Sequence, residues 1–177
     1  MPATTRLSGR TRKTVLVLHI VSVGAWIGMD VVLAILVFTA LLSNSDHTKS
    51  LCYQALELFA VWPLFGAGLV CLATGVVLGV GSKYGVVRFW WVALKLALNL
   101  LMTALVLISL RVGIPEVAED GRRLAAGEPS TTTIGDVIFP PVVAPLLLLT
   151  AVVLSVFKPW GRIRTRTSSA QTPTRRR

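Results

Sequence analysis

The chain has 177 residues, of which 54% are hydrophobic and only 15% are charged, and its mean hydropathy is +0.72. A soluble domain of this size would expose much of that apolar surface to water, so the composition argues against a soluble enzyme and indicates a membrane protein. The net charge of +10 indicates an anionic partner. The distribution of the basic residues along the chain indicates which kind of partner this is.

Four apolar segments, taken in chain order, predict an all-α polytopic membrane protein. We expect helices at about 14–42, 51–81, 86–111 and 137–157, all within one transmembrane domain, residues 14–158. Each segment is longer than the ~20 residues that a helix needs to cross the hydrocarbon core. The first segment exceeds the ~7–15 apolar residues of a cleaved signal peptide, so we expect it to remain as a helix. The prediction is a four-transmembrane-helix bundle.

The basic residues predict its orientation. Most of the 18 Lys and Arg residues lie in the N-terminal tail 1–13, in the short connection 81–88 and in the C-terminal tail from residue 158 onward, which hold none of the acidic residues. By the positive-inside rule both termini are then cytoplasmic, an N-in/C-in arrangement. The basic tails are expected to bind anionic lipids of the inner leaflet. The C-terminal tail, 159–177, is expected to be disordered. No nucleic-acid-binding fold is recognisable, so no nucleic-acid partner is predicted.

The long connection 112–136 is expected to be an outer loop that carries most of the remaining charges. Within it, a short separate helix is predicted at Pro115–Ala126, with proline in its first turn and Gly127 after its end. The fourth apolar segment has no charged residue and three prolines in its outer half, which predicts a structural role.

Four ionisable residues interrupt the apolar segments: His19 and Asp30 in the first, Glu57 in the second and Lys95 in the third. A charge at the centre of a membrane helix costs ~2.5–3.5 kcal/mol on insertion scales, so such side chains face protein or water. At 100° per residue, His19 and Asp30 share one helix face, and Lys95 shares another with Asn99. Three helices therefore each present a polar stripe, and Glu57 is expected to face the bundle despite a kink predicted at Pro63.

Depth along the helices predicts which of these residues meet. A rise of ~1.5 Å per residue places His19 and Lys95 in an inner layer, and Asp30 and Glu57 in an outer layer with Arg111 above them. Two carboxylates at one depth favour a shared proton. A salt bridge between Asp30 and Lys95 is the alternative. The pattern predicts ion or proton handling, or interhelical pairing alone.

Glycines four residues apart predict close helix packing in a membrane segment rather than a nucleotide loop. Two such pairs occur, Gly24 with Gly28 and Gly75 with Gly79. They suit a neighbouring helix of the chain, of a second copy in a homo-oligomer or of a partner in a membrane complex. No metal-binding or hydrolase motif accompanies them, so neither a metal site nor a catalytic residue is predicted.

Two short motifs resemble known families. The letters LHI at 18–20 and GAWIG at 24–28 resemble the first helix of a small four-helix family of bacterial integral-membrane proteins of unknown function. The letters LKLAL at 94–98 are similar, more distantly, to an element of the CopD-type copper-resistance domain and the HemJ-type protoporphyrinogen oxidases. This resemblance implies a multi-pass protein of the bacterial cytoplasmic membrane.

The HemJ-type resemblance also implies a haem b site. It would make His19 an axial ligand and let Lys95 or Arg88 pair with a propionate. The chain departs from that pattern because its second histidine, His47, lies in a predicted outer loop, so bis-histidine ligation is not available, and no His/Met cluster suits copper. Three functions are therefore expected: a non-enzymatic membrane protein that handles ions or protons, a haem-binding redox protein, or an accessory subunit of a membrane complex.

Overall fold

The computed structural model describes residues 8–81 and 89–157, with only the backbone described at 134–137. This part of the chain contains no β-strand and is built of six α-helices and one π-helical turn. They are α1 (Gly9–Leu42), α2 (Asp46–Phe59), α3 (Trp62–Val80), α4 (Trp90–Leu105), η1 (Val106–Leu110), α5 (Arg111–Ala125) and α6 (Ile134–Phe157). The predicted all-α fold class is confirmed.

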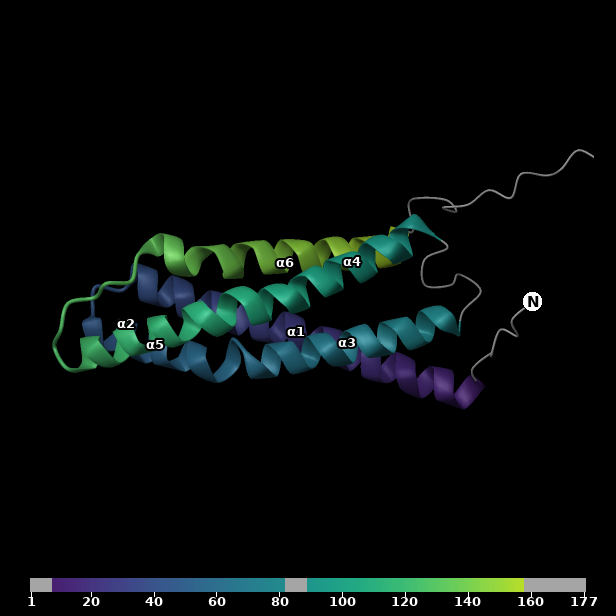
Figure 1. Ribbon diagram of the computed structural model, residues 1–177, viewed down its shortest axis with the longest axis horizontal. Helices are drawn as coiled ribbons and strands as arrows, with labels where there is room; N and C mark the ends of the chain where they lie inside the picture. Colours follow the sequence, from purple (N-terminus) through teal and green to yellow (C-terminus); the bar gives the residue numbers. More distant parts are fainter. Residues whose placement is uncertain (1–7, 82–88, 158–177) are drawn as a thin grey trace, which may run out of the picture.

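The helices form four rods that run side by side (Figure 1). α1 and α6 are single helices, α2 and α3 follow one another in the second rod, and α4, η1 and α5 make the third. Each rod is long and apolar enough to cross a membrane, over Gly9–Leu42, Asp46–Val80, Trp90–Ala125 and Ile138–Phe157. Large apolar side chains remain exposed on their outward faces, as lipid contact requires. The predicted four-helix membrane bundle is confirmed.

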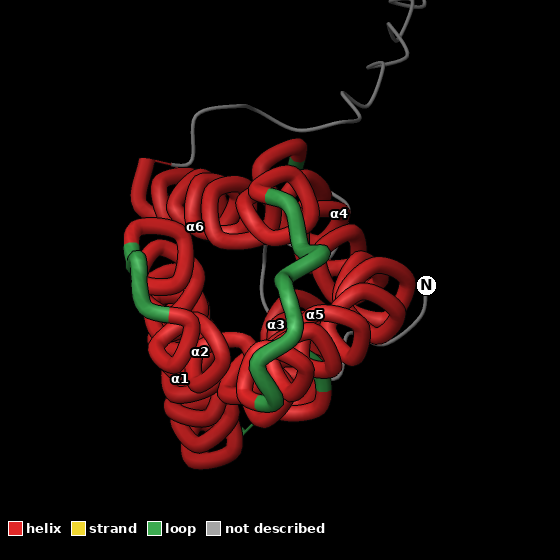
Figure 2. The backbone as a smooth tube through the Cα atoms, turned by 90° about the vertical axis from the view of Figure 1, so that its left-hand side faces the viewer, coloured by secondary structure: helices red, strands yellow, loops and turns green. Residues whose placement is uncertain are grey.

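Two ends of the bundle can be distinguished. α1 begins and α6 ends at one end, called the tail end here, whereas α2 and α5 lie at the other, called the α2/α5 end (Figure 1). Figure 2 looks onto the α2/α5 end and shows the rods arranged around a common axis. Under the predicted orientation the tail end would face the cytoplasm.

Two helices begin earlier than predicted because serine side chains cap them. The Ser8 side chain accepts a hydrogen bond from the Thr11 backbone N–H, so α1 begins at Gly9 and the last part of the predicted tail 1–13 is helical. The Ser45 side chain caps α2 in the same way through Thr48. Such caps satisfy orphan N–H groups at a helix start, which hydropathy does not reveal.

The kink predicted at Pro63 is confirmed as a break between two helices. α2 ends at Phe59 and α3 begins at Trp62, with Pro63 in the first turn of α3. Proline has no backbone N–H to donate and is tolerated in a first turn. The second predicted helix, 51–81, is therefore two helices with separately oriented faces.

The prediction of an outer loop at 112–136 is wrong over its first half. The third rod does not end at residue 111 but passes through η1 into α5 and continues to Ala125. The predicted separate helix at Pro115–Ala126 is thus the continuation of this rod, and Gly127, with φ of 83°, follows its end as expected. The helix persists because Val117 and Leu124 on its apolar face are buried in the contact with α2.

The core follows one face of α1. The buried residues Trp26, Leu33, Val37 and Ala40 recur at helical spacing and pack with residues of the other rods. Gly68 of α3 allows a close approach, since a Cβ atom there would lie 3.0 Å from the Trp26 ring and 2.9 Å from Thr103 Oγ1.

Candidate functional site

Asp30 is buried on the inner face of α1. Only 3% of the residue is exposed, and its Oδ2 atom has no hydrogen-bond partner among the described residues. Trp26 lies one helical turn away and is 1% exposed, and its indole Nε1 also has no hydrogen-bond partner among the described residues. An ionised carboxylate without a partner is very costly in such surroundings. The neutral acid is the form that this environment accepts.

Asp30 does not meet either of its predicted partners. Lys95 Nζ instead donates a hydrogen bond to Ser155 Oγ at 3.0 Å and lies 4.8 Å from the centre of the Trp91 ring. Glu57 is exposed, so the predicted layer of two carboxylates is wrong. Depth along a helix fixes the level of a side chain but not the direction in which it points.

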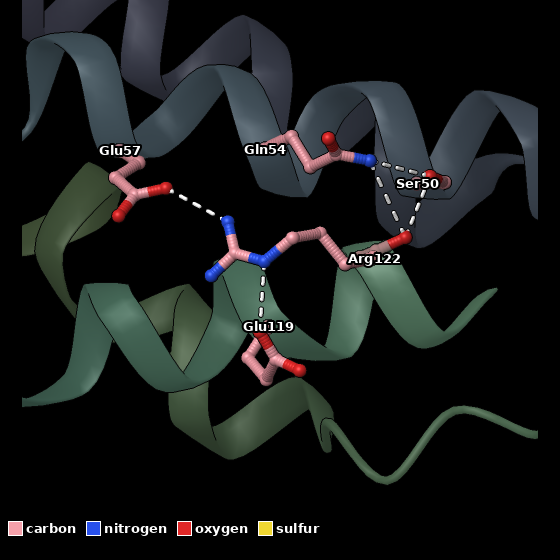
Figure 3. Close-up of polar contacts among 6 residues, drawn as sticks. Ser50, Gln54, Glu57, Glu119 and Arg122 are labelled. Atoms are coloured by element: carbon pink, nitrogen blue, oxygen red, sulfur yellow. Dashed lines mark hydrogen bonds and ion pairs between the residues drawn. The ribbon is translucent and has the colours of Figure 1, made fainter. Parts of the chain in front are cut away.

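Glu57 pairs with α5 rather than facing the bundle interior (Figure 3). Its Oε2 accepts a hydrogen bond from Arg122 Nη1 at 3.1 Å, and Arg122 Nε donates to Glu119 Oε2 at 2.7 Å. About half of the Glu57 side chain, 47%, is exposed. Arg122 reaches Glu57 because the third rod continues into α5. This pair was not predicted, because Arg122 was expected to lie in a loop. Arg111, predicted above the carboxylates, lies over the Trp62 ring at 5.8 Å.

A buried hydrogen bond to the backbone of Gly121 also joins these two helices. Ser50 Oγ donates to the Gly121 carbonyl at 2.6 Å, and Gln54 Nε2 donates to Ser50 Oγ at 2.9 Å (Figure 3). A Cβ atom at Gly121 would lie 2.9 Å from Tyr53 Cβ, so the absence of a side chain permits this approach. These contacts give the α2/α5 end a fixed shape.

The Asp120 side chain hydrogen-bonds to the segment that follows α5, residues 130–132. Its buried carboxylate accepts hydrogen bonds from Ser130 Oγ at 2.7 Å, from Thr131 N and Oγ1 at 2.8 and 2.9 Å, and from Thr132 N at 3.3 Å. This structural role was not predicted, because Asp120 was placed in a loop. The carboxylate orders residues 130–132 against the end of α5.

His19 joins α1 to α3. Its Nδ1 lies 3.0 Å from Thr74 Oγ1 and 3.2 Å from the Cys71 carbonyl oxygen. The Thr74 hydroxyl can donate its one proton to the Val70 carbonyl at 2.6 Å, and the Cys71 carbonyl can only accept. Nδ1 therefore carries a proton, and in the neutral form of the ring Nε2 then keeps its lone pair. His19 therefore makes an interhelical contact between α1 and α3.

A polar network continues from His19 into α4. Asn99 Nδ2 donates to Cys71 Sγ at 3.2 Å, and Thr103 Oγ1 lies 3.4 Å from Asn99 Oδ1. Cys71 Sγ is itself 3.9 Å from His19 Nδ1. The polar stripes predicted at His19 and at Asn99 thus meet through Cys71 of α3, although no contact between these two residues was predicted. Cys71, Thr74 and Thr103 were missed because short, weakly polar side chains barely alter a hydropathy profile.

The glycine pairs differ in what they pack against. A Cβ atom at Gly75 would lie 3.3 Å from His19 Cε1, so this glycine leaves room for the imidazole ring. Nothing lies within 4 Å of a Cβ atom built at Gly24 or Gly28. The predicted packing of that pair is therefore not made with the described part of the chain.

The residues proposed for a haem can be placed only in part. His19 lies in the network with its Nε2 lone pair available, Lys95 is bonded to Ser155, and Arg88 lies outside the described residues. Within 8–81 and 89–157, no group of three or more His, Cys, Asp or Glu side chains is arranged to hold a metal ion.

Comparisons with known proteins leave the function to be argued from this geometry. No family model, curated protein or solved structure matches the chain.

Proposed function

We propose that this chain is a multi-pass protein of the bacterial cytoplasmic membrane, N-in/C-in, that binds a proton at Asp30 and exchanges it with water. The observation that supports this most is the Asp30 carboxyl itself, which is buried inside a membrane bundle with Oδ2 unpartnered in the described structure. A carboxyl group kept only for structure would be expected to have its hydrogen bonds satisfied. With no cation paired with it among residues 8–81 and 89–157, a proton is the counter-charge that such a carboxyl can take.

The charged groups of the surrounding helices support this assignment. Glu57 of α2 and Arg122 of α5 pair with each other, Lys95 of α4 bonds Ser155, and Arg111 lies over Trp62. α3 and residues 138–157 of α6 carry no charged side chain. His19, on the same face of α1 but eleven residues or ~16 Å away, offers a second group that can bind a proton. The two groups lie at successive depths in one polar interior.

Reconstituted vesicles with a pH-sensitive dye inside test this function. Under a potassium diffusion potential, we expect vesicles containing the wild-type protein to change internal pH faster than empty vesicles. Asn at position 30 cannot bind and release a proton, so Asp30→Asn should lower the rate to that of empty vesicles. Glu57→Gln is the matched control and should retain the wild-type rate. Equal rates for wild type and Asp30→Asn would contradict proton conduction through Asp30, and the infrared band of a protonated Asp30 would then decide whether the carboxyl binds a proton at all.

Haem binding is a second candidate, and the tautomer of His19 favours it. Donation of the Nδ1 proton to an oxygen orients the imidazole and leaves Nε2 as a ligand, which is how metal-binding histidines are held. In this case His19 would be the axial ligand, and Lys95 or Arg88 would pair with a propionate. The other histidine, His47, lies in the first turn of α2, so it belongs to the opposite end of the bundle.

An absorption spectrum decides between the two functions. Haem binding predicts a Soret band in protein purified from cells supplied with haem, lost in His19→Ala and kept in Asp30→Asn. Colourless protein from such cells would count against this candidate and leave the proton proposal standing.

A further inference from the structure

A cavity lies between Asp30 and the α2/α5 end. It has a volume of about 60 Å³, is partly open, and is lined by residues of α1, α2, η1, α5 and α6. Leu33 and Val37 of its lining follow Asp30 on the buried face of α1 at the spacing of successive helical turns. Gly113 of α5 and Pro141 of α6 line other sides. The cavity thus continues the line of Asp30 toward this end of the molecule.

The cavity is large enough for water and has polar groups to hold it. A water molecule needs ~10–15 Å³ of such space and two or more polar partners. Ser109 of η1, an exposed residue that carries a hydroxyl, is one of the lining residues. Pro145 has no backbone N–H, so the carbonyl of Pro141, four residues earlier, lacks its usual helical donor. These groups suit a few water molecules.

The two directions away from Asp30 differ. Toward the cavity, the next side chain on the buried face is Leu33, three residues or ~4.5 Å along the helix. Toward the tail end, the next is Trp26, which is buried and packs closely against Gly68 of α3, itself close to Thr103 of α4. An aliphatic side chain that can change rotamer is a smaller obstacle than an indole held by close contacts on α3 and α4.

From this asymmetry we infer that the cavity is a water-filled vestibule through which Asp30 exchanges its proton with the aqueous phase at the α2/α5 end. Leu33 is the side chain that separates the carboxyl from this water. The inference rests on the proposed proton-binding role of Asp30 and adds the side of the membrane from which the site is reached.

Hydrogen–deuterium exchange of the Asp30 carboxyl tests the route. The carboxylic-acid C=O stretch, assigned by its loss in Asp30→Asn, is followed by infrared spectroscopy after transfer of the protein into D₂O. Leu33→Ala should speed exchange about tenfold, which equals ~1.4 kcal/mol in the free energy of opening. Gly113→Leu, which fills the vestibule, should slow exchange by a similar factor. Gly66→Leu is the control, because Gly66 is exposed and has open space around it.

The outcomes separate the inference from the function on which it rests. Faster exchange in Leu33→Ala and slower exchange in Gly113→Leu support the vestibule, and Gly113→Leu alone decides if Leu33→Ala does not fold. Exchange that is unaffected by Gly113→Leu, or that is accelerated only by Trp26→Phe, would overturn the vestibule and place access at the tail end. The absence of any Asp30-dependent band would instead overturn the proton-binding role itself.

Discussion

Replacing Asp120 with alanine is expected to lower the free energy of unfolding by about 3 kcal/mol. The buried carboxylate accepts four hydrogen bonds from Ser130, Thr131 and Thr132. Hydrogen bonds to a charged group contribute ~1.5–3 kcal/mol each. In the variant the freed donors can bond to water, so the expected loss is smaller than the sum of the four. Residues 130–132 should then detach from the end of α5. Thermal unfolding in detergent measures the loss of stability, and limited proteolysis reports the detachment.

A matched control lies on the same helix. Glu116 is exposed on α5, so Glu116→Ala should change stability by less than about 0.5 kcal/mol. Equal stabilities for the two variants would mean that the Asp120 hydrogen bonds do not hold the connection between α5 and α6.

Replacing Trp26 with alanine should cost about 3–5 kcal/mol, the range for truncation of a buried Trp. The side chain is 1% exposed and fills the space left by Gly68 between α1, α3 and α4. Trp90→Ala is the matched control, since Trp90 is exposed and should lose under about 1 kcal/mol. Thermal unfolding in one detergent compares both variants with the wild type.

Trp26→Phe distinguishes packing from hydrogen bonding at the same position. The indole Nε1 has no partner in the described structure, so removing its N–H should cost only the change in size. If Trp26→Phe were as destabilising as Trp26→Ala, the indole N–H would have to have a partner, and the buried face near Asp30 would not be dry.

The fold was predictable because membrane helices must be long and apolar. Length and hydropathy alone located the four rods, and Pro63 marked the break in the second. Helix ends were not predictable in the same way. Ser8 and Ser45 extend two helices through single cap hydrogen bonds, and α5 is held by its contact with α2, an interaction between segments far apart in the sequence.

The candidate site was predictable in its residues but only partly in its contacts. His19 and Asn99, predicted on two separate polar stripes, belong to one network that runs through Cys71. Glu57 was misplaced because the break before Pro63 gives α2 its own orientation and α5 supplies Arg122. The burial of Asp30 followed from the sequence, whereas the absence of a described partner depended on where the other charged side chains point.

The central claim, that Asp30 carries a proton inside the bundle, is tested most directly by infrared spectroscopy of the purified protein at neutral pH. We predict a C=O stretch of a protonated carboxylic acid that is lost in Asp30→Asn and unchanged in Glu57→Gln. A spectrum without such a band, in which Asp30→Asn removes only carboxylate absorption, would show that Asp30 is ionised and would contradict the account.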